Sequence, residues 1–208
     1  MTHTIQDAAL LNQHGAAFLA SNQPEQALKC FQTALQYVIN PEDAHMLDTS
    51  CSHSSAQLLA STKLQDSDDD YIYDKPFFFN PAANMADEET GPFGAVILFN
   101  LALSYHEQAK LLGESHLKMA MQLYEKCLLL LREQNHFDCS NIIIAALHNQ
   151  AKIFEHFYDH QLAAEKYSVL SALLEREEIR RDTLEQEDLN SICLDIYFFK
   201  FPTCAPVA

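Results

Sequence analysis

The sequence predicts an all-α protein, because of where its helix-breaking residues stand and how its apolar residues are spaced. Five of the seven prolines lie at or before Pro92 and the other two lie near the end, so residues 93–201 contain none. Inside a helix Pro costs about 3 kcal/mol and Gly about 1 kcal/mol, so this stretch permits long helices. Apolar residues three and four positions apart, as on one helix face, predict that helices form there.

Four segments carry this helical spacing along the chain. The first follows Pro24, which suits a first helical turn. The last is preceded by Asp182 and Glu185, which are spaced as in a capping box. The apolar positions are Ala27, Phe31, Ala34 and Val38; Leu117, Met121, Tyr124, Leu128 and Leu131; Ala163, Tyr167, Leu170 and Leu174; and Leu189, Ile192, Ile196 and Phe199.

Residues 41–92 have a different composition, with Ser-rich and acidic stretches between two prolines. This interval is long for a structureless loop, so we interpret it as an insertion or linker. Within it, the aromatic segment 71–79 is too apolar to be solvated throughout, and we expect it to lie against the first helices of the predicted hairpins and to occupy part of the surface that they line. Ser67 precedes three aspartates, as in substrates of acid-directed kinases, although the stretch would equally serve as a solubilising linker.

Three pairs of segments share one template of small and aromatic residues. Each segment has spacings of four and three, and such residues suit two helices in close antiparallel contact, since small residues let backbones approach while rings fill the gaps. The pairs are Leu11, Gly15 and Phe18 with Ala27, Phe31 and Ala34; Leu98, Ala102 and Tyr105 with Ala120, Tyr124 and Cys127; and Leu147, Ala151 and Phe154 with Ala163, Tyr167 and Leu170.

This template resembles the tetratricopeptide repeat, a helix–turn–helix unit. The gap from aromatic to small residue is 9 in the first and third units, as in the family, but 15 in the second, and Trp is absent. The resemblance implies about three irregular antiparallel hairpins and a C-terminal capping helix. The first hairpin would span 1–40, the insertion 41–92, the second and third hairpins 93–181, and the capping helix and tail 182–208.

The resemblance also implies a concave groove that is lined by the first helices and binds a peptide or protein segment. Any one of its residues could instead be buried or solvated without a binding role. The predicted groove residues are Asn12, Phe99, His106, His148, Lys152 and Glu155.

Members of the family that hold a partner's C-terminal carboxylate use Lys, Asn and Arg at five positions. The corresponding residues here are Asn12, Ala16, Asn100, Ala145 and Asn149, of which only Asn100 fits. Without cationic donors a carboxylate loses its hydration with little in return. We therefore do not expect binding of a terminal carboxylate.

Charge restricts the partner further. The chain has 13 Lys and Arg against 29 Asp and Glu, a formal net charge of −16 at pH 7. This balance disfavours nucleic acid and anionic membranes, and it favours a basic or apolar protein segment over an acidic one. The four glycines form no phosphate-binding loop, and we expect no cofactor. No secretory signal or membrane span is recognisable, so we expect a cytoplasmic or nuclear location.

The sequence gives little support for catalysis, and we expect a protein that is not an enzyme. His156 and His160 have the spacing of metal ligands, but they flank a predicted helix–helix turn, where polar residues are ordinary. We therefore expect no metal site. A self-associating helical bundle and, less favoured, a metal-dependent hydrolase built on these two histidines are the alternatives.

Overall fold

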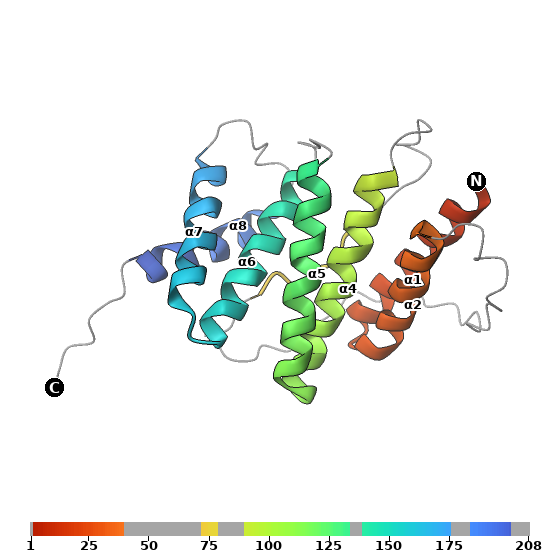
Figure 1. Cartoon of the computed structure of the whole chain (residues 1–208), viewed down its shortest axis with the longest axis horizontal. Helices are drawn as coiled ribbons and strands as arrows, with labels where there is room; N and C mark the ends of the chain where they lie inside the picture. The colour runs from red at the N-terminus through yellow and green to blue at the C-terminus, as the bar shows by residue number, and fades with distance from the viewer. Residues whose placement is uncertain (1, 40–71, 79–89, 134–138, 176–183, 201–208) are drawn as a thin grey trace. The chain divides into compact units, whose positions relative to one another are not determined.

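The computed structural model describes residues 2–39, 72–78, 90–133, 139–175 and 184–200. These residues form seven helices and no strand, which confirms the all-α class (Figure 1). Ser67 and most of the predicted insertion lie outside the described residues. The helices are α1 (Thr2–Ala20), α2 (Pro24–Ile39), α4 (Thr90–Leu112), α5 (Glu114–Glu133), α6 (Ser140–His156), α7 (His160–Leu174) and α8 (Gln186–Lys200).

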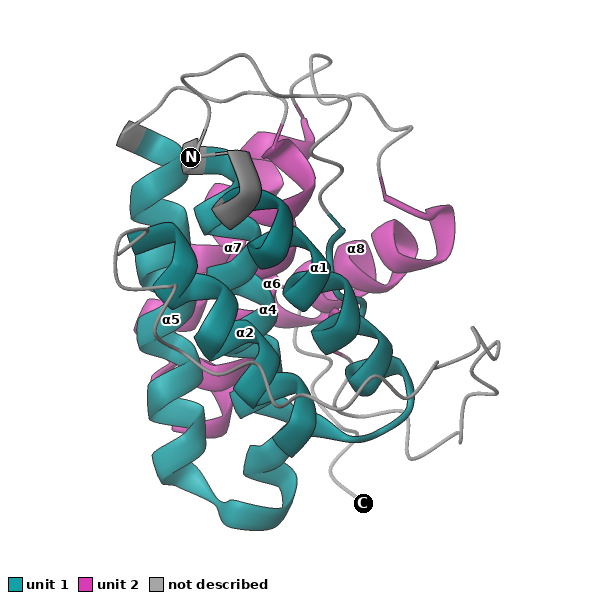
Figure 2. Ribbon diagram, turned by 90° about the vertical axis from the view of Figure 1, so that its right-hand side faces the viewer, with its two compact units in different colours: residues 1–65, 74–136 teal, residues 66–73, 137–208 magenta. Residues whose placement is uncertain are grey.

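The chain divides into two compact units, coloured separately in Figure 2. Of the described residues, unit 1 contains α1, α2, α4, α5 and residues 74–78, and unit 2 contains residues 72–73, α6, α7 and α8. In unit 1, α1 packs on α2, α2 on α4, and α4 on α5. In unit 2, α6 packs on α7, and α7 packs on α8.

In the pairs α1–α2, α4–α5 and α6–α7, a short turn with one residue in the left-handed region joins the two helices. These residues are Asn22 (φ 54°), Gly113 (φ 84°) and Tyr158 (φ 57°). In the first pair the Gln23 N–H donates to the Phe18 carbonyl at 2.9 Å, and in the third the Asp159 N–H donates to the Phe154 carbonyl at 2.9 Å. This is the bond of a Schellman motif, which ends a helix and reverses the chain. The two turns therefore share one geometry at equivalent template positions.

The second helix pair corrects two boundaries expected from the sequence. Helix α4 begins at Thr90 rather than at residue 93, with Pro92 in the first turn, where a missing N–H has no helical partner to lose. The longer gap between Tyr105 and Ala120 forms no loop. Helix α4 runs to Leu112 and α5 starts at Glu114, so the extra residues lengthen both helices around Gly113.

Small residues face aromatic rings inside the helix pairs. Ala27, Ala120 and Ala163 are fully buried. A Cβ atom added to Gly15 of α1 would lie 2.5 Å from Cε1 of Phe31 on α2. Because real Cβ atoms do not approach a ring so closely, α1 and α2 can pack as they do only with glycine at position 15.

Helix α8 supplies the apolar face predicted for the last helix. Ile192 and Ile196 are buried, and the Phe199 ring lies 4.9 Å from the Tyr167 ring of α7. Asp182 of the predicted capping box lies outside the described residues.

The glycine contact gives a stability prediction. Gly15→Ala should lower the free energy of unfolding by about 1–2 kcal/mol, because overpacking against the buried Phe31 ring exceeds the helix propensity that alanine adds. Urea denaturation followed by circular dichroism measures the change. Gly94→Ala is the matched control: its added Cβ would lie 3.2 Å from Cδ2 of Leu130, at the end of a flexible side chain, and 3.9 Å from Cγ1 of Val38. Equal stability of Gly15→Ala and the wild type would contradict the packing described.

Candidate functional site

The described residues contain an asparagine that binds both backbone groups of one residue. In unit 1, Asn100 of α4 accepts a hydrogen bond from the Phe77 N–H at its Oδ1 atom, at 2.8 Å. Its Nδ2 atom donates to the Phe77 carbonyl, also at 2.8 Å. Residue 77 lies in the segment 72–78, which forms no helix, strand or turn. The Asn100 amide thus replaces the backbone partner that Phe77 would have in a sheet.

Asn12 of α1 completes this arrangement. Its Nδ2 atom donates to the Phe77 carbonyl at 3.2 Å, and its Oδ1 atom accepts from Asn100 Nδ2 at 2.9 Å. Both asparagines are 0% exposed. A buried polar group without a hydrogen-bond partner destabilises the fold by about 1–3 kcal/mol. The hydrogen bonds with Phe77 therefore explain how Asn12 and Asn100 can be buried in an apolar surrounding. We call Asn12 and Asn100 the unit 1 clamp.

Aromatic contacts fix the side chain of the clamped residue. The Phe77 ring meets the Phe99 ring edge-on, with centroids 4.9 Å apart. Phe99 is fully buried, and its ring centroid also lies 5.4 Å from that of Tyr124 of α5. Such pairs contribute about 0.5–1.5 kcal/mol beyond the burial of their area. The unit 1 clamp therefore binds one residue by its backbone and by an aromatic side chain.

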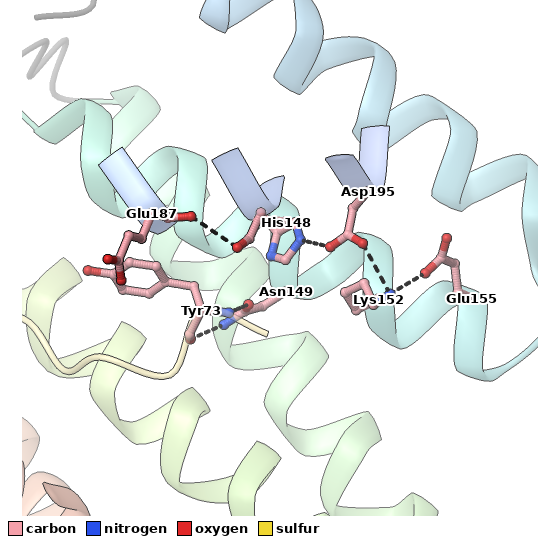
Figure 3. Close-up of polar contacts among 8 residues, drawn as sticks. Tyr73, His148, Asn149, Lys152, Glu155, Glu187 and Asp195 are labelled. Atoms are coloured by element: carbon pink, nitrogen blue, oxygen red, sulfur yellow. Dashed lines mark hydrogen bonds and ion pairs between the residues drawn. The ribbon is translucent and has the colours of Figure 1, made fainter. Parts of the chain in front are cut away.

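Unit 2 repeats this chemistry on Tyr73, as Figure 3 shows. Asn149 of α6 accepts from the Tyr73 N–H at 2.8 Å and donates to the Tyr73 carbonyl at 3.0 Å. Asn149 is 0% exposed and Tyr73 is buried. Asn100 and Asn149 hold the same template position, two residues after Leu98 and Leu147 respectively. We call Asn149 the unit 2 clamp.

The face of α6 in unit 2 also carries a polar cluster with α8 (Figure 3). His148 Nε2 lies 2.8 Å from Asp195 Oδ2, and the His148 side chain is fully buried. Lys152 Nζ lies 3.1 Å from Glu155 Oε2 and 3.9 Å from Asp195 Oδ1. Through Asp195, α8 is paired with two polar residues of α6.

These contacts show where the six predicted groove residues lie. Asn12 and Phe99 contact Phe77, while His148 and Lys152 pair with α8 and Glu155 pairs with Lys152. His106 is buried, with its ring 6.2 Å from that of Tyr124. Four of the predicted groove residues thus contact other segments of the chain: Asn12 and Phe99 contact Phe77, and His148 and Lys152 pair with Asp195 of α8. The expectation that the aromatic segment lies against the first helices is confirmed at Tyr73, which contacts α6, and at Phe77, which contacts α1 and α4.

In the sequence, Asn100 and Asn149 stand out only as positions of a carboxylate-binding pattern, which does not indicate their pairing with the backbone. The available signal was their shared template position. Asn100 also interrupts an otherwise apolar run, and a lone amide in such a run needs a partner once it is buried.

The less favoured alternative from the sequence, a metal site at His156 and His160, has the following geometry. His156 ends α6 and His160 begins α7, and both are exposed. Within the described part of the chain, no three His, Cys, Asp or Glu side chains are grouped so that they could hold a metal ion. None of the four described cysteines is in a disulfide bond, and Cys30 and Cys127 are buried. No helix among the described residues has the length and apolarity needed to cross a bilayer.

Comparisons with protein-family models, with curated proteins and with solved structures give no match to this chain. The geometry of the clamps is therefore the basis on which a function can be argued. Their chemistry is recognition of a peptide backbone, since a side-chain amide offers an acceptor and a donor that match the N–H and C=O of one residue.

Removing a clamp should have a measurable cost. Asn100→Ala should lower the free energy of unfolding by about 2–3 kcal/mol, because it leaves Asn12 and both backbone groups of Phe77 without that partner. Gln13→Ala is the matched control, since Gln13 is exposed and holds the equivalent position in the first unit; it should change stability by less than about 0.5 kcal/mol. Similar effects of both substitutions in urea denaturation would count against the clamp.

The clustered charges of unit 2 give a prediction about alkaline pH. Burial, followed by the negative charges of Glu155 and Asp195, holds the pKa of the Tyr167 phenol well above its ordinary value of 10.0. Above about pH 10 the unfolded chain releases this proton and the folded chain keeps it. The free energy of unfolding should therefore fall by up to about 1.4 kcal/mol per pH unit from this group.

Tyr167→Phe retains the ring that packs on Phe199 but has no proton to release. Urea denaturation at about pH 9 and about pH 11 should thus show a smaller loss of stability in Tyr167→Phe than in the wild type. Parallel losses in the two proteins would contradict the assignment.

Proposed function

We propose that this protein is a non-catalytic protein–protein interaction module that binds a non-helical segment of a partner through amide side chains of its first helices. The observation that carries the proposal is the use of Asn100 and Asn149, at one template position, to bind the N–H and C=O of a single residue. These groups are engaged within a helix or sheet, so the clamps select a segment whose backbone is free.

The arrangement of helices supports a tetratricopeptide-like interpretation of the three helix pairs. Each pair buries a template alanine, and the first and third pairs share a Schellman turn. In arrays of this kind the first helices line the binding surface, and the clamp residues Asn12, Asn100 and Asn149 lie on the first helices α1, α4 and α6. Helix α8 would be the terminal cap of such an array.

Charge and composition support the choice of partner. The net charge of −16 favours a basic or apolar segment over an acidic one, nucleic acid or an anionic membrane. The clamps bind backbone without charged groups, so they need no cofactor. The expected cytoplasmic or nuclear location of this protein implies a partner from the same compartment.

Self-association is the competing function, and one observation favours it. Leu194, Tyr197 and Phe198 on α8 are each more than half exposed and form an apolar strip at helical spacing. Sedimentation analysis distinguishes the two functions, because a monomer at all concentrations tested would disfavour self-association.

Selection from a displayed library of random peptides tests the proposal. The targets are the wild type and Phe77→Ser, a variant that loosens the chain's own segment. Peptides recovered on either target should bind about tenfold or more weakly when the asparagine that holds them, Asn100 or Asn149, is replaced by alanine, since each provides two hydrogen bonds to the backbone of one residue.

Gln13→Ala is the control in the same background and should leave peptide affinity unchanged. Failure to enrich any peptide on either target would contradict the proposed function. So would peptides whose affinity is the same with and without the two asparagines.

A further inference from the structure

In unit 1, residues 74–78 occupy the position at which a partner segment would bind to the unit 1 clamp. We propose that they are a tethered occupant of the peptide site, and that the partner segment displacing them carries an aromatic residue in the place of Phe77. This inference rests on the proposed function and names its ligand class and its regulation. It is argued from the unit 1 clamp, where both the backbone and the side-chain contacts are defined.

The segment is bound in the manner of a ligand. The bonds to Phe77 come from the side-chain amides of Asn12 and Asn100, not from a helix or sheet that includes the segment. Asp74 is exposed, Phe77 is only partly buried, and Phe78 is 64% exposed. A segment of the core buries most of its side chains, whereas this segment has single residues bound by the clamps and exposed residues next to them.

Two features of the clamp define the ligand. The donor to Asn100 Oδ1 is a backbone N–H, so the clamped residue cannot be proline. The ring beside Phe99 must be replaced by another ring, because a small side chain would leave the Phe99 face uncovered. Pro76, immediately before the clamped residue, has no N–H and disfavours helix, which keeps the backbone groups of Phe77 free. The expected ligand is a non-helical segment with an aromatic residue, preferably after proline.

Tethering makes the occupant a regulator. A covalently attached segment competes for the clamp at an effective concentration on the order of 1 mM. A free peptide with the same contacts therefore binds only those molecules whose own segment has left the clamp. Anything that weakens the contact of Phe77 therefore increases the apparent affinity for a partner. The wild type is expected to bind weakly, and a chain with a loosened segment strongly.

Fluorescence anisotropy with a labelled peptide of residues 70–80 tests this directly. Phe77→Ser should bind the peptide about tenfold or more tightly than the wild type. Phe78→Ser is the matched control, since the neighbouring ring is exposed, and it should bind like the wild type. Adding Asn100→Ala to Phe77→Ser should abolish the gain, and a peptide with Ser or Pro in place of Phe77 should not bind.

Each contrary result overturns the inference. A folded Phe77→Ser protein that binds the peptide no more tightly than the wild type would show that the segment is no competitor. If selected library peptides need the asparagines yet bind Phe77→Ser and wild type equally, the proposed function stands and the tethered occupant fails. If the wild type forms a dimer and Phe77→Ser is a monomer, the clamp binds the segment of a second copy of this chain. That result would contradict a separate partner.

Hydrogen exchange on the wild type keeps the inference testable if Phe77→Ser does not fold. The Phe77 amide should exchange by local opening, at least about a hundredfold faster than the most protected amides of α4, because the segment can leave while the helices stay folded. If the Phe77 amide and the most protected amides of α4 exchange only through global unfolding, the segment is an integral part of the core. That result would overturn the inference.

Discussion

The pairing of a buried asparagine with the two backbone groups of one residue is the interaction on which the site depends. A primary amide offers an acceptor and two donors, and Asn100 uses all three on Phe77 and Asn12. Such a group is stable in an apolar surrounding only while its partners are in place. Burial of the clamps therefore requires a backbone against them, and whatever replaces residues 72–78 must supply the same N–H and C=O.

The helix pairs explain how the clamps come to hold equivalent positions. Contacts such as that of Gly15 with Phe31 set how closely two helices approach, and short turns with a left-handed residue fix where the second helix starts. When the same template recurs, the residue two positions after its leading leucine recurs with it. Asn100 and Asn149 hold the same template position, and each binds the backbone of one residue within its own unit.

Much of the helical structure was predictable, because spacing and breakers act over a few residues. The template alanines are buried as the template requires, and Asn12 and Phe99 were singled out. The pairing of Asn149 with Tyr73 joins residues 76 positions apart, and that of Asn12 with Phe77 joins residues 65 apart; no local pattern reports such contacts. The covering of His148 and Lys152 by α8 was missed for the same reason.

Nuclear Overhauser effects in solution test the central claim most directly. If Asn100 clamps Phe77, the side-chain amide protons of Asn100 will show cross-peaks to the backbone N–H of Phe77 and to the side chain of Asn12. The Phe77 ring protons will show cross-peaks to those of the Phe99 ring. An assigned spectrum in which the Asn100 amide protons contact only residues of its own helix and solvent would contradict the clamp, and the function argued from it would lose its basis.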